Sequence, residues 1–377
     1  TRLGNLGNIL DEAPDQCDHL LLHSPVLTVP EWDALCLYLG DKAAAIDCTF
    51  VDDGSDNTFH AALDRIQAEA EEAVRSGCEH VMLTDLNVSA NRVPLPMILA
   101  TGAVHSHLVR QQLRTFASVN VASGESLDVH HFAVLIGVGA TTVNAYVAEA
   151  AIADRYARGL LPGLEIGDAV GNYRKAIEDG LLKIMSKMGI SVIASYRGGY
   201  NFEALGLSRS LVASYFPPMS SRISGLGIKG IAARVVAMHR KAFAADDVHL
   251  PVGGFFRYRK SGERHAFDGQ LIHAMQHACD TGSYESWKKY SAIVASQNPI
   301  NLRDLLDFKP MQDAVEIEKV ESITVIRKRL VSPGISLGAL SPEAHETLSI
   351  AMNRIGAKSD SGEGGEDPAR VKLRENG

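Results

Sequence analysis

Side chains that could do chemistry gather in one glycine-rich stretch near the end of the chain, residues 358–367. Its glycines would let backbone amides face an anion or a planar cofactor, while Lys358 would offer a positive charge and Glu363 or Glu366 a carboxylate. Composition alone also fits an acidic flexible loop. The stretch therefore suggests a ligand site, with a flexible loop as the competing interpretation.

Two other glycine motifs carry weaker signals. Residues 225–230 match G-x-G-x-x-G, but the residues before them are Ser-Ser-Arg-Ile-Ser rather than a hydrophobic strand, so we interpret them as a loop that enters a helix over residues 231–243. Residues 132–141 predict a strand over 132–136, a glycine turn and a helix. Ligands of α/β sheets bind at such strand ends, although close helix packing would explain the same glycines.

The histidine, aspartate and cysteine patterns predict no metal site. His105 and His107 are two apart on a predicted helix and do not share a face, and His130 and His131 are adjacent on a predicted strand and point opposite ways. Residues 52–56 (Asp-Asp-Gly-Ser-Asp) lack the ligand alternation and closing Glu of a calcium loop. Five cysteines without C-x-x-C spacing fit structural thiols in a reducing compartment.

Arg197 follows a predicted strand over residues 191–195 and precedes two glycines. An arginine at such an edge could bind an anion or hold a domain interface, and no acid or base is spaced to complete a catalytic set. A non-catalytic metabolite-binding or interaction module, binding at Arg197 or at the glycine-rich stretch, is therefore an alternative to an enzyme.

The pattern of strands and helices that must position these residues indicates an α/β fold. Short apolar runs alternate with helix-length segments, which is typical of βα units around largely parallel sheets. Strands are predicted over residues 20–22, 45–50, 80–83, 118–122, 132–136 and 191–195. Residues 59–76 predict an amphipathic helix that Gly77 ends. Helices are also predicted over 269–277 and 284–295.

A second unit is predicted to begin at residue 316, which gives domains 1–315 and 316–377. It opens with a helix over 320–330 and a short strand over 336–339, and Ser341 then caps a helix that begins at Pro342. One helix and one or two strands bury too little surface for a stable domain. We therefore expect a truncated domain.

Composition narrows the function classes. The 377 residues hold 37 Lys and Arg against 45 Asp and Glu, so the net charge is −8, which argues against a nucleic-acid partner. The longest uncharged run, residues 132–148, is shorter than the roughly 20 apolar residues of a membrane span, and the acidic first fifteen residues do not form a secretory signal. We predict a cytoplasmic protein without a membrane partner, and its start at Thr1 rather than Met suggests a piece of a longer chain.

A likeness to a known family runs along nearly the whole chain. Its motifs are Pro94-Leu95-Pro96, Gly102-Ala103-Val104-His105, Val129-His130-His131-Phe132-Ala133, Asn172-Tyr173-Arg174-Lys175-Ala176, Lys183-Ile184-Met185-Ser186-Lys187-Met188-Gly189, Ser195-Tyr196-Arg197-Gly198, Gly338-Ala339-Leu340-Ser341, Ala351-Met352-Asn353-Arg354-Ile355-Gly356 and Ser361-Gly362-Glu363-Gly364-Gly365-Glu366-Asp367. They resemble the large subunit of glutamate synthase. The first six resemble its central domain, and the last three resemble the opening of its FMN-binding TIM-type β/α barrel.

The resemblance implies a part of an enzyme that makes two L-glutamate from L-glutamine and 2-oxoglutarate. In this family, ammonia passes from an amidotransferase domain through a tunnel to an FMN site, and electrons arrive through a 3Fe-4S cluster from an NADPH-dependent small subunit or from ferredoxin. A β-helix domain completes the subunit. This chain would link the amidotransferase to the synthase site and help to form the tunnel. Alone it should be inactive and bind no cofactor tightly.

The resemblance also assigns residues. Ser336, Gly338 and Ala339 would lie near FMN, at the end of the first barrel strand. Lys358, Gly362, Glu363, Gly365 and Glu366 would border the 2-oxoglutarate pocket and the tunnel exit. Glu366 is the best candidate for a gating or substrate-sensing carboxylate. Ala339 stands where the family often has Ser, so only a backbone contact is expected there. No catalytic or metal-binding residue is expected within this chain.

Overall fold

A computed structural model describes residues 1–8, 10–11, 19–54, 57–244, 252–310, 313–372 and 375. Cys17, Ser55 and Asp56 lie outside the described residues. The chain divides into two compact units, residues 1–249 and residues 250–377, which are described separately. None of the described helices is long and apolar enough to cross a membrane.

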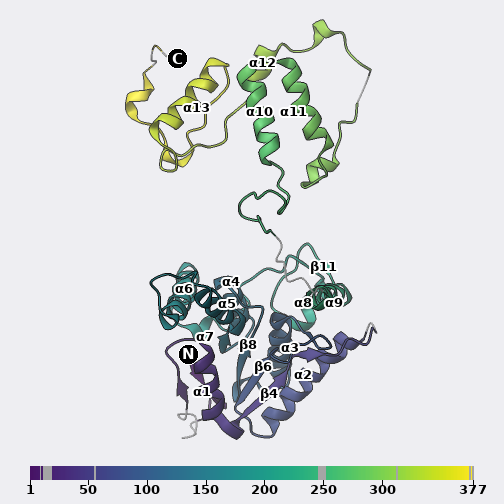
Figure 1. The fold of residues 1–377 in the computed structure, drawn as a ribbon, viewed down its shortest axis with the longest axis vertical. Coiled ribbons are helices and arrows are strands. Elements are labelled where there is room, and N and C mark those ends of the chain that lie inside the picture. Colours follow the sequence, from purple (N-terminus) through teal and green to yellow (C-terminus); the bar gives the residue numbers. More distant parts are fainter. Residues whose placement is uncertain are drawn as a thin grey trace. The chain divides into compact units, whose positions relative to one another are not determined.

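The first unit is built around a five-stranded parallel sheet (Figure 1). In spatial order its strands are β3 (Val26–Leu27), β9 (Thr142–Asn144), β8 (Ser118–Ala122), β6 (His80–Thr84) and β4 (Ala43–Asp47). Every residue of β8 is buried, as expected of a central strand covered on both faces. The predicted α/β fold with a largely parallel sheet is confirmed.

Alternation along the strands sends side chains to two cores. Val81 and Leu83 of β6 pack in the larger core, whereas Met82, between them, packs in a smaller core with Trp32. The larger core includes α2 (Thr58–Arg75) and α3 (Met97–Arg110), and the smaller one includes α1 (Val29–Leu39). The prediction of an amphipathic helix over residues 59–76 is confirmed by α2.

Two predicted strands are helices in the structure. Residues 132–136 belong to α4 (Val129–Gly137), which begins where the Asp128 side chain accepts hydrogen bonds from the amides of His130 and His131. The run is almost wholly apolar because α4 is buried along most of its length, so it shows no clear helical period. Residues 193–195 likewise belong to α7 (Ile193–Tyr196). The strand of this region, β9, lies after the Gly139 turn rather than before it.

The remaining helices of the first unit surround this sheet. They are α5 (Tyr146–Ala157), α6 (Ile166–Lys187), α8 (Arg209–Tyr215) and α9 (Ile228–Ala244). Three short strand pairs join β1 (Arg2–Leu3) with β2 (Leu20–Leu21), β5 (Thr49–Phe50) with β7 (Val93–Pro94), and β10 (Gly206–Leu207) with β11 (Gly225–Leu226). The G-x-G-x-x-G segment does enter a helix, α9, as predicted. A Cβ at Gly225 would lie 2.2 Å from the Gly206 carbonyl oxygen, so close backbone pairing accounts for this glycine.

The second unit is mainly helical. A hairpin of α10 (Gly269–Thr281) and α11 (Tyr284–Ser296) is followed by α12 (Ile323–Arg327) and α13 (Pro342–Arg354). Ser341 caps α13 as predicted, accepting a hydrogen bond from the Ala344 amide at 3.3 Å. The predicted strand over 336–339 is instead a turn, and the predicted helix over 320–330 is reduced to α12.

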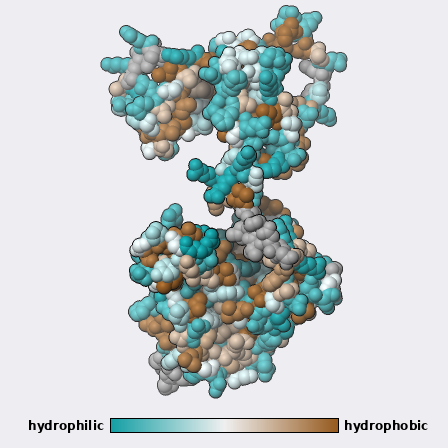
Figure 2. Space-filling model, in the orientation of Figure 1, coloured by the Kyte–Doolittle hydropathy of each residue, from teal (hydrophilic) through white to brown (hydrophobic). Residues whose placement is uncertain are grey.

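Large apolar side chains of the second unit are exposed. Phe256 is 96% exposed and Phe308 is 97% exposed, and Figure 2 shows apolar patches among the hydrophilic residues of this unit. Large contiguous apolar patches are uncommon on the surfaces of monomeric proteins. The unit therefore buries only a small part of its own apolar surface.

Candidate functional site

The two segments that carry the predicted site residues run parallel in the second unit. Val331 and Lys358 form a parallel β-bridge, and farther along the Ile335 amide donates to the Asp360 carbonyl oxygen at 3.1 Å. Helix α13 connects the two segments, which makes the arrangement similar to a βαβ unit. The turn that begins at Ser336 and the loop over 361–366 consequently lie at the same, carboxyl end of the pair, where α/β proteins bind ligands.

Ser336 joins the turn to the loop. Its Oγ accepts a hydrogen bond from the Gly338 amide at 3.3 Å and its carbonyl oxygen accepts one from the Ala339 amide at 3.0 Å. A hydrogen bond from the Ser336 hydroxyl also lowers the pKa of Glu363, which stays ionised to lower pH. The structure thus brings together Ser336, Gly338, Ala339 and Glu363.

Backbone angles and close contacts explain why the loop over residues 361–366 contains glycines. Gly362 and Gly365 have φ angles of +61° and +63°, which favour glycine. A Cβ at Gly364 would lie 3.0 Å from Ser336 Oγ and 3.2 Å from the Leu337 amide nitrogen. The loop therefore packs backbone against backbone on the turn. Lys358 takes part through its backbone, and its side chain is exposed.

Hydrogen bonds of a buried histidine support this arrangement. His345, which is fully buried, donates from Nε2 to the Ile335 carbonyl oxygen at 3.0 Å and accepts at Nδ1 from Arg370 Nη1 at 2.7 Å. Arg370 Nη2 lies 4.0 Å from Glu366 Oε1. Glu366 is therefore linked, through Arg370 and His345, to the residue that precedes Ser336. Sequence reasoning missed His345 and Arg370, although His345 occurs on the apolar face of a predicted helix.

A second polar group lies at the carboxyl edge of the five-stranded sheet. Asp85 follows β6, is 3% exposed and accepts hydrogen bonds from the Gly124 amide at 3.1 and 3.0 Å. Glu125, after β8, accepts one from the Met97 amide at 2.9 Å. Burial raises the pKa of Asp85, and burial together with the Asp85 charge raises the pKa of Glu125. Sequence reasoning missed this pair, although each acid lies within three residues of the end of a correctly predicted strand.

Asp85→Asn is expected to have a pH-dependent effect on stability. Because the pKa of Asp85 is raised on folding, the folded protein binds the carboxyl proton more tightly than the unfolded chain does. The contribution of Asp85 to the stability of the folded protein is therefore lost as pH rises from the unfolded pKa through the folded one. The free energy of unfolding of the Asn variant, relative to that of wild type, should therefore be higher at pH 7 than at pH 4, by on the order of 1 kcal/mol. Urea unfolding at both pH values measures this. Asp33→Asn, at an exposed position of α1, is the control, and an equal effect of Asp85→Asn at both pH values would contradict the expectation.

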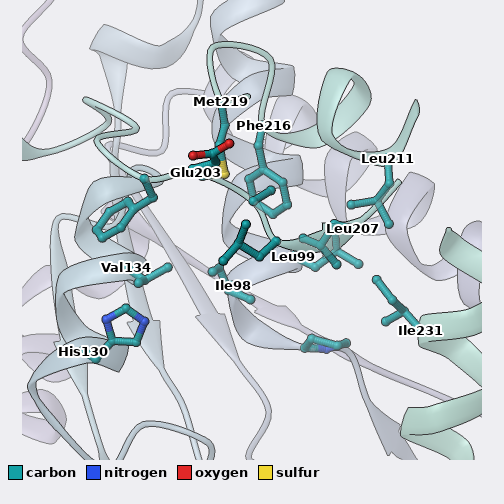
Figure 3. Close-up of a pocket in the computed structure, with 14 residues that line it drawn as sticks. Ile98, Leu99, His130, Val134, Glu203, Leu207, Leu211, Phe216, Met219 and Ile231 are labelled. Atoms are coloured by element: carbon teal, nitrogen blue, oxygen red, sulfur yellow. The ribbon is translucent and has the colours of Figure 1, made fainter. Parts of the chain in front are cut away.

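An apolar pocket of about 280 Å³ lies at the start of α3 and α4, against α8 and α9 (Figure 3). Among its lining residues only His130 and Glu203 can ionise, and Figure 3 shows their side chains apart, His130 on α4 and Glu203 beside Met219. Glu203 pairs with Arg222 at 3.2 Å. The Glu203 carboxylate thus has a structural partner and the rest of the lining is apolar apart from His130, so the pocket shows no catalytic set.

The other polar candidates have structural partners. His107 Nε2 lies 2.7 Å from Glu71, and His131 Nδ1 accepts from the Leu127 amide at 3.0 Å. No group of three or more His, Cys, Asp or Glu residues in the described ranges could hold a metal ion. Cys36, Cys48, Cys78 and Cys279 are unpaired, and burial raises the pKa of Cys48 to about 12, which makes it unreactive.

Comparison with known proteins gives two family matches. The model described as glutamate synthase central domain matches residues 1–208, and the model described as conserved region in glutamate synthase matches residues 265–377.

Relatives match along the entire chain. The chain is 59% identical over 377 residues to the glutamate synthase [NADPH] large chain of Azospirillum brasilense, covering 100% of this chain and 25% of that protein. It is 39% identical over 380 residues to the corresponding large chain of Bacillus subtilis, with the same coverage. It is 38% identical over 391 residues to ferredoxin-dependent glutamate synthase 2 of Synechocystis, covering 98% of this chain and 25% of that protein. The chain therefore spans about a quarter of the length of these relatives.

Proposed function

Because the chain belongs to the glutamate synthase family, we propose that it works as one part of a large subunit that makes L-glutamate from L-glutamine and 2-oxoglutarate. The observation that carries the proposal is the 59% identity along the whole chain to a glutamate synthase large chain. The juxtaposition of the Ser336 turn and the glycine loop over 361–366 supports it, because these are the segments assigned to the synthase site. Residues 1–315 would form the linking domain and residues 316–377 the start of the FMN-binding barrel.

The turn at Ser336 fits one edge of an FMN site but not its phosphate end. The amides of Gly338 and Ala339 are already bonded to Ser336, so they are not free to hold a phosphate. Exposed Gly338 and Ala339 present backbone with little side chain, against which a flat ring could stack. FMN, when bound, supplies the hydride that reduces the imine of 2-oxoglutarate. The residues of this chain would orient it, and most of its contacts and the 3Fe-4S cluster would come from elsewhere in the subunit.

Glu363 and Glu366 would face the substrate and the ammonia route. Glu363 is held ionised by Ser336, and an anionic group there could accept a hydrogen bond from ammonia or exclude a misplaced carboxylate. Glu366 is connected to the Ser336 turn through Arg370 and His345, so a movement of the glycine loop would be transmitted to the turn. We assign Glu366 the gating or sensing role, with Lys358, Gly362 and Gly365 bordering the same pocket.

The remaining domains of the subunit would be the main partners. The exposed apolar side chains of the second unit, such as Phe308, fit burial against them. The relatives include NADPH-dependent, NADH-dependent and ferredoxin-dependent enzymes, so either a small subunit or ferredoxin would deliver the electrons. We expect a cytoplasmic location, since the unpaired cysteines fit a reducing compartment.

Comparing the isolated chain with the complete subunit tests the proposal. Residues 1–377 alone should bind no FMN tightly and should not reduce 2-oxoglutarate in the presence of ammonia. The complete subunit, supplied with its electron donor, should form glutamate from glutamine and 2-oxoglutarate. Tight FMN binding with reductive activity in the isolated chain, or a complete subunit without glutamate formation, would contradict the proposal.

A further inference from the structure

The partly buried arginines of the first unit differ in whether they have an acidic partner among the described residues. Three of them are paired: Arg65 with Glu69, Arg92 with Asp47, and Arg174 with Glu31 and Glu178. In the described ranges, by contrast, no ion pair involves Arg114 or Arg197, although both side chains are partly buried. Removing a guanidinium from water without an anion beside it costs free energy, so the positions of Arg114 and Arg197 require an explanation.

Arg114 is fixed by neutral acceptors. Its guanidinium donates to His105 Nδ1 at 2.9 Å, to the Ala117 carbonyl oxygen at 2.5 Å and to the Gly139 carbonyl oxygen at 2.9 Å. Burial, and next the charge of Arg197, lower the pKa of Arg114 to about 9. Arg114 therefore remains a cation at neutral pH, and none of its acceptors neutralises it.

Arg197 lies beside the same histidine. The neighbouring Gly198 lies against the His105 ring, since a Cβ there would be 3.1 Å from Cε1 and 3.3 Å from Nε2. The amide of Gly198 is fixed to the Ile136 carbonyl oxygen at 3.0 Å. No protein hydrogen bond of the Arg197 guanidinium occurs in the described part of the chain. Its donors are free for a ligand.

His105 provides a second free donor. Burial, followed by the charges of Arg114 and Arg197, lowers the pKa of His105 to about 3, so the ring is neutral at physiological pH. Because Nδ1 accepts from Arg114, the ring proton is on Nε2. No acceptor for this N–H is found among the residues the structure describes. The Cε1 and Nε2 atoms of this ring lie close to Gly198, the residue that follows Arg197.

We propose that Arg197 and the Nε2–H of His105 bind a carboxylate, with Arg114 as a fixed second positive charge behind them. A guanidinium matches the two oxygens of a carboxylate, and a charge-assisted bond is about twice as strong as a neutral one. Gly198 and Gly199, which follow Arg197, carry no side chain that could cover it. The carboxylate would belong either to a small free acid or to an Asp or Glu side chain of another part of the longer subunit.

Arginine labelling of the complete subunit distinguishes these sources. Phenylglyoxal modifies free guanidinium groups, and mass spectrometry of peptides gives the rate at each position. Arg158, whose side chain is 66% exposed beside Asp154, is the internal control. If a free acid binds, Arg197 should react without ligand and at least tenfold more slowly with glutarate, while Arg158 reacts equally in both. A rate at Arg197 that matches the Arg158 rate with and without glutarate would overturn the proposal.

If a protein side chain binds, Arg197 should react slowly with or without glutarate. Arg197→Gln should then lower the melting temperature of the complete subunit by several degrees relative to Arg158→Gln, and Arg197→Lys should restore part of the loss. Removal of an unpaired buried charge would instead leave stability unchanged or raise it. Slow labelling without a loss of stability would therefore also overturn the proposal. Neither measurement uses activity, so a failure here leaves the proposed function untouched.

Discussion

Gly139→Ala is expected to destabilise the first unit by about 3 kcal/mol or more, one of the largest effects of any single methyl group in this chain. Gly139 has a φ angle of +124°, a region that L-residues rarely adopt. Its Cβ would also lie 2.2 Å from His105 Nδ1 and 2.4 Å from Cγ. The ring cannot retreat easily, because Arg114 holds Nδ1 at 2.9 Å and Tyr200 packs against the ring with centroids 5.8 Å apart.

Urea unfolding of the 377-residue chain measures this effect. The chain has two tryptophans, and a Trp287→Phe background leaves Trp32, which is 6% exposed, as a reporter of the first unit. Gly159→Ala is the matched control: φ is +67°, but no atom lies within 4 Å of the added methyl group, so a cost of about 1 kcal/mol is expected from backbone strain alone. Equal losses for the two variants would show that contact with His105 contributes nothing.

Sequence patterns predicted the central strands well, because a strand buried on both faces gives a short, recognisable run in the sequence. The runs at β6 and β8 are short and bounded by turns, and the structure has strands at both. The same reasoning failed at residues 132–136, where a helix buried along most of its length gives an equally continuous apolar run. The local signal that favours the helix is Asp128, whose side chain caps two amides.

Only part of the candidate site could be predicted from the sequence, and the reason differs from that for the strands. Glycines and carboxylates over residues 358–366 indicate a ligand loop by composition, and the structure places this loop against Ser336. The supporting contacts join residues that are 10 and 25 positions apart, His345 with Ile335 and His345 with Arg370. No periodicity or local motif specifies such pairs, because they arise from the path of α13 between two parallel segments.

Glu366→Gln is expected to lower glutamine-dependent glutamate formation by the complete subunit at least tenfold, or about 1.4 kcal/mol, while glutamine hydrolysis continues. The change keeps the shape of the side chain and removes its charge. Arg370, whose side chain is 13% exposed, would lose the carboxylate beside it and retain only the uncharged acceptor of His345. The loop over 362–366 would then hold a less defined position relative to Ser336, which uncouples the arrival of ammonia from its use.

Three measurements on the complete subunit separate gating from general damage. These are the rate of glutamate formation, the rate of glutamine hydrolysis and the FMN content, each compared with wild type and with Glu318→Gln, which removes an exposed carboxylate elsewhere in the second unit. A gating role predicts that the ratio of synthesis to hydrolysis falls for Glu366→Gln alone, at unchanged FMN content. Loss of FMN together with both rates would show that Glu366 only maintains the fold. An unchanged ratio at full activity would show that its charge is not used, because Gln fills the same space and Arg370 still has His345 as a partner.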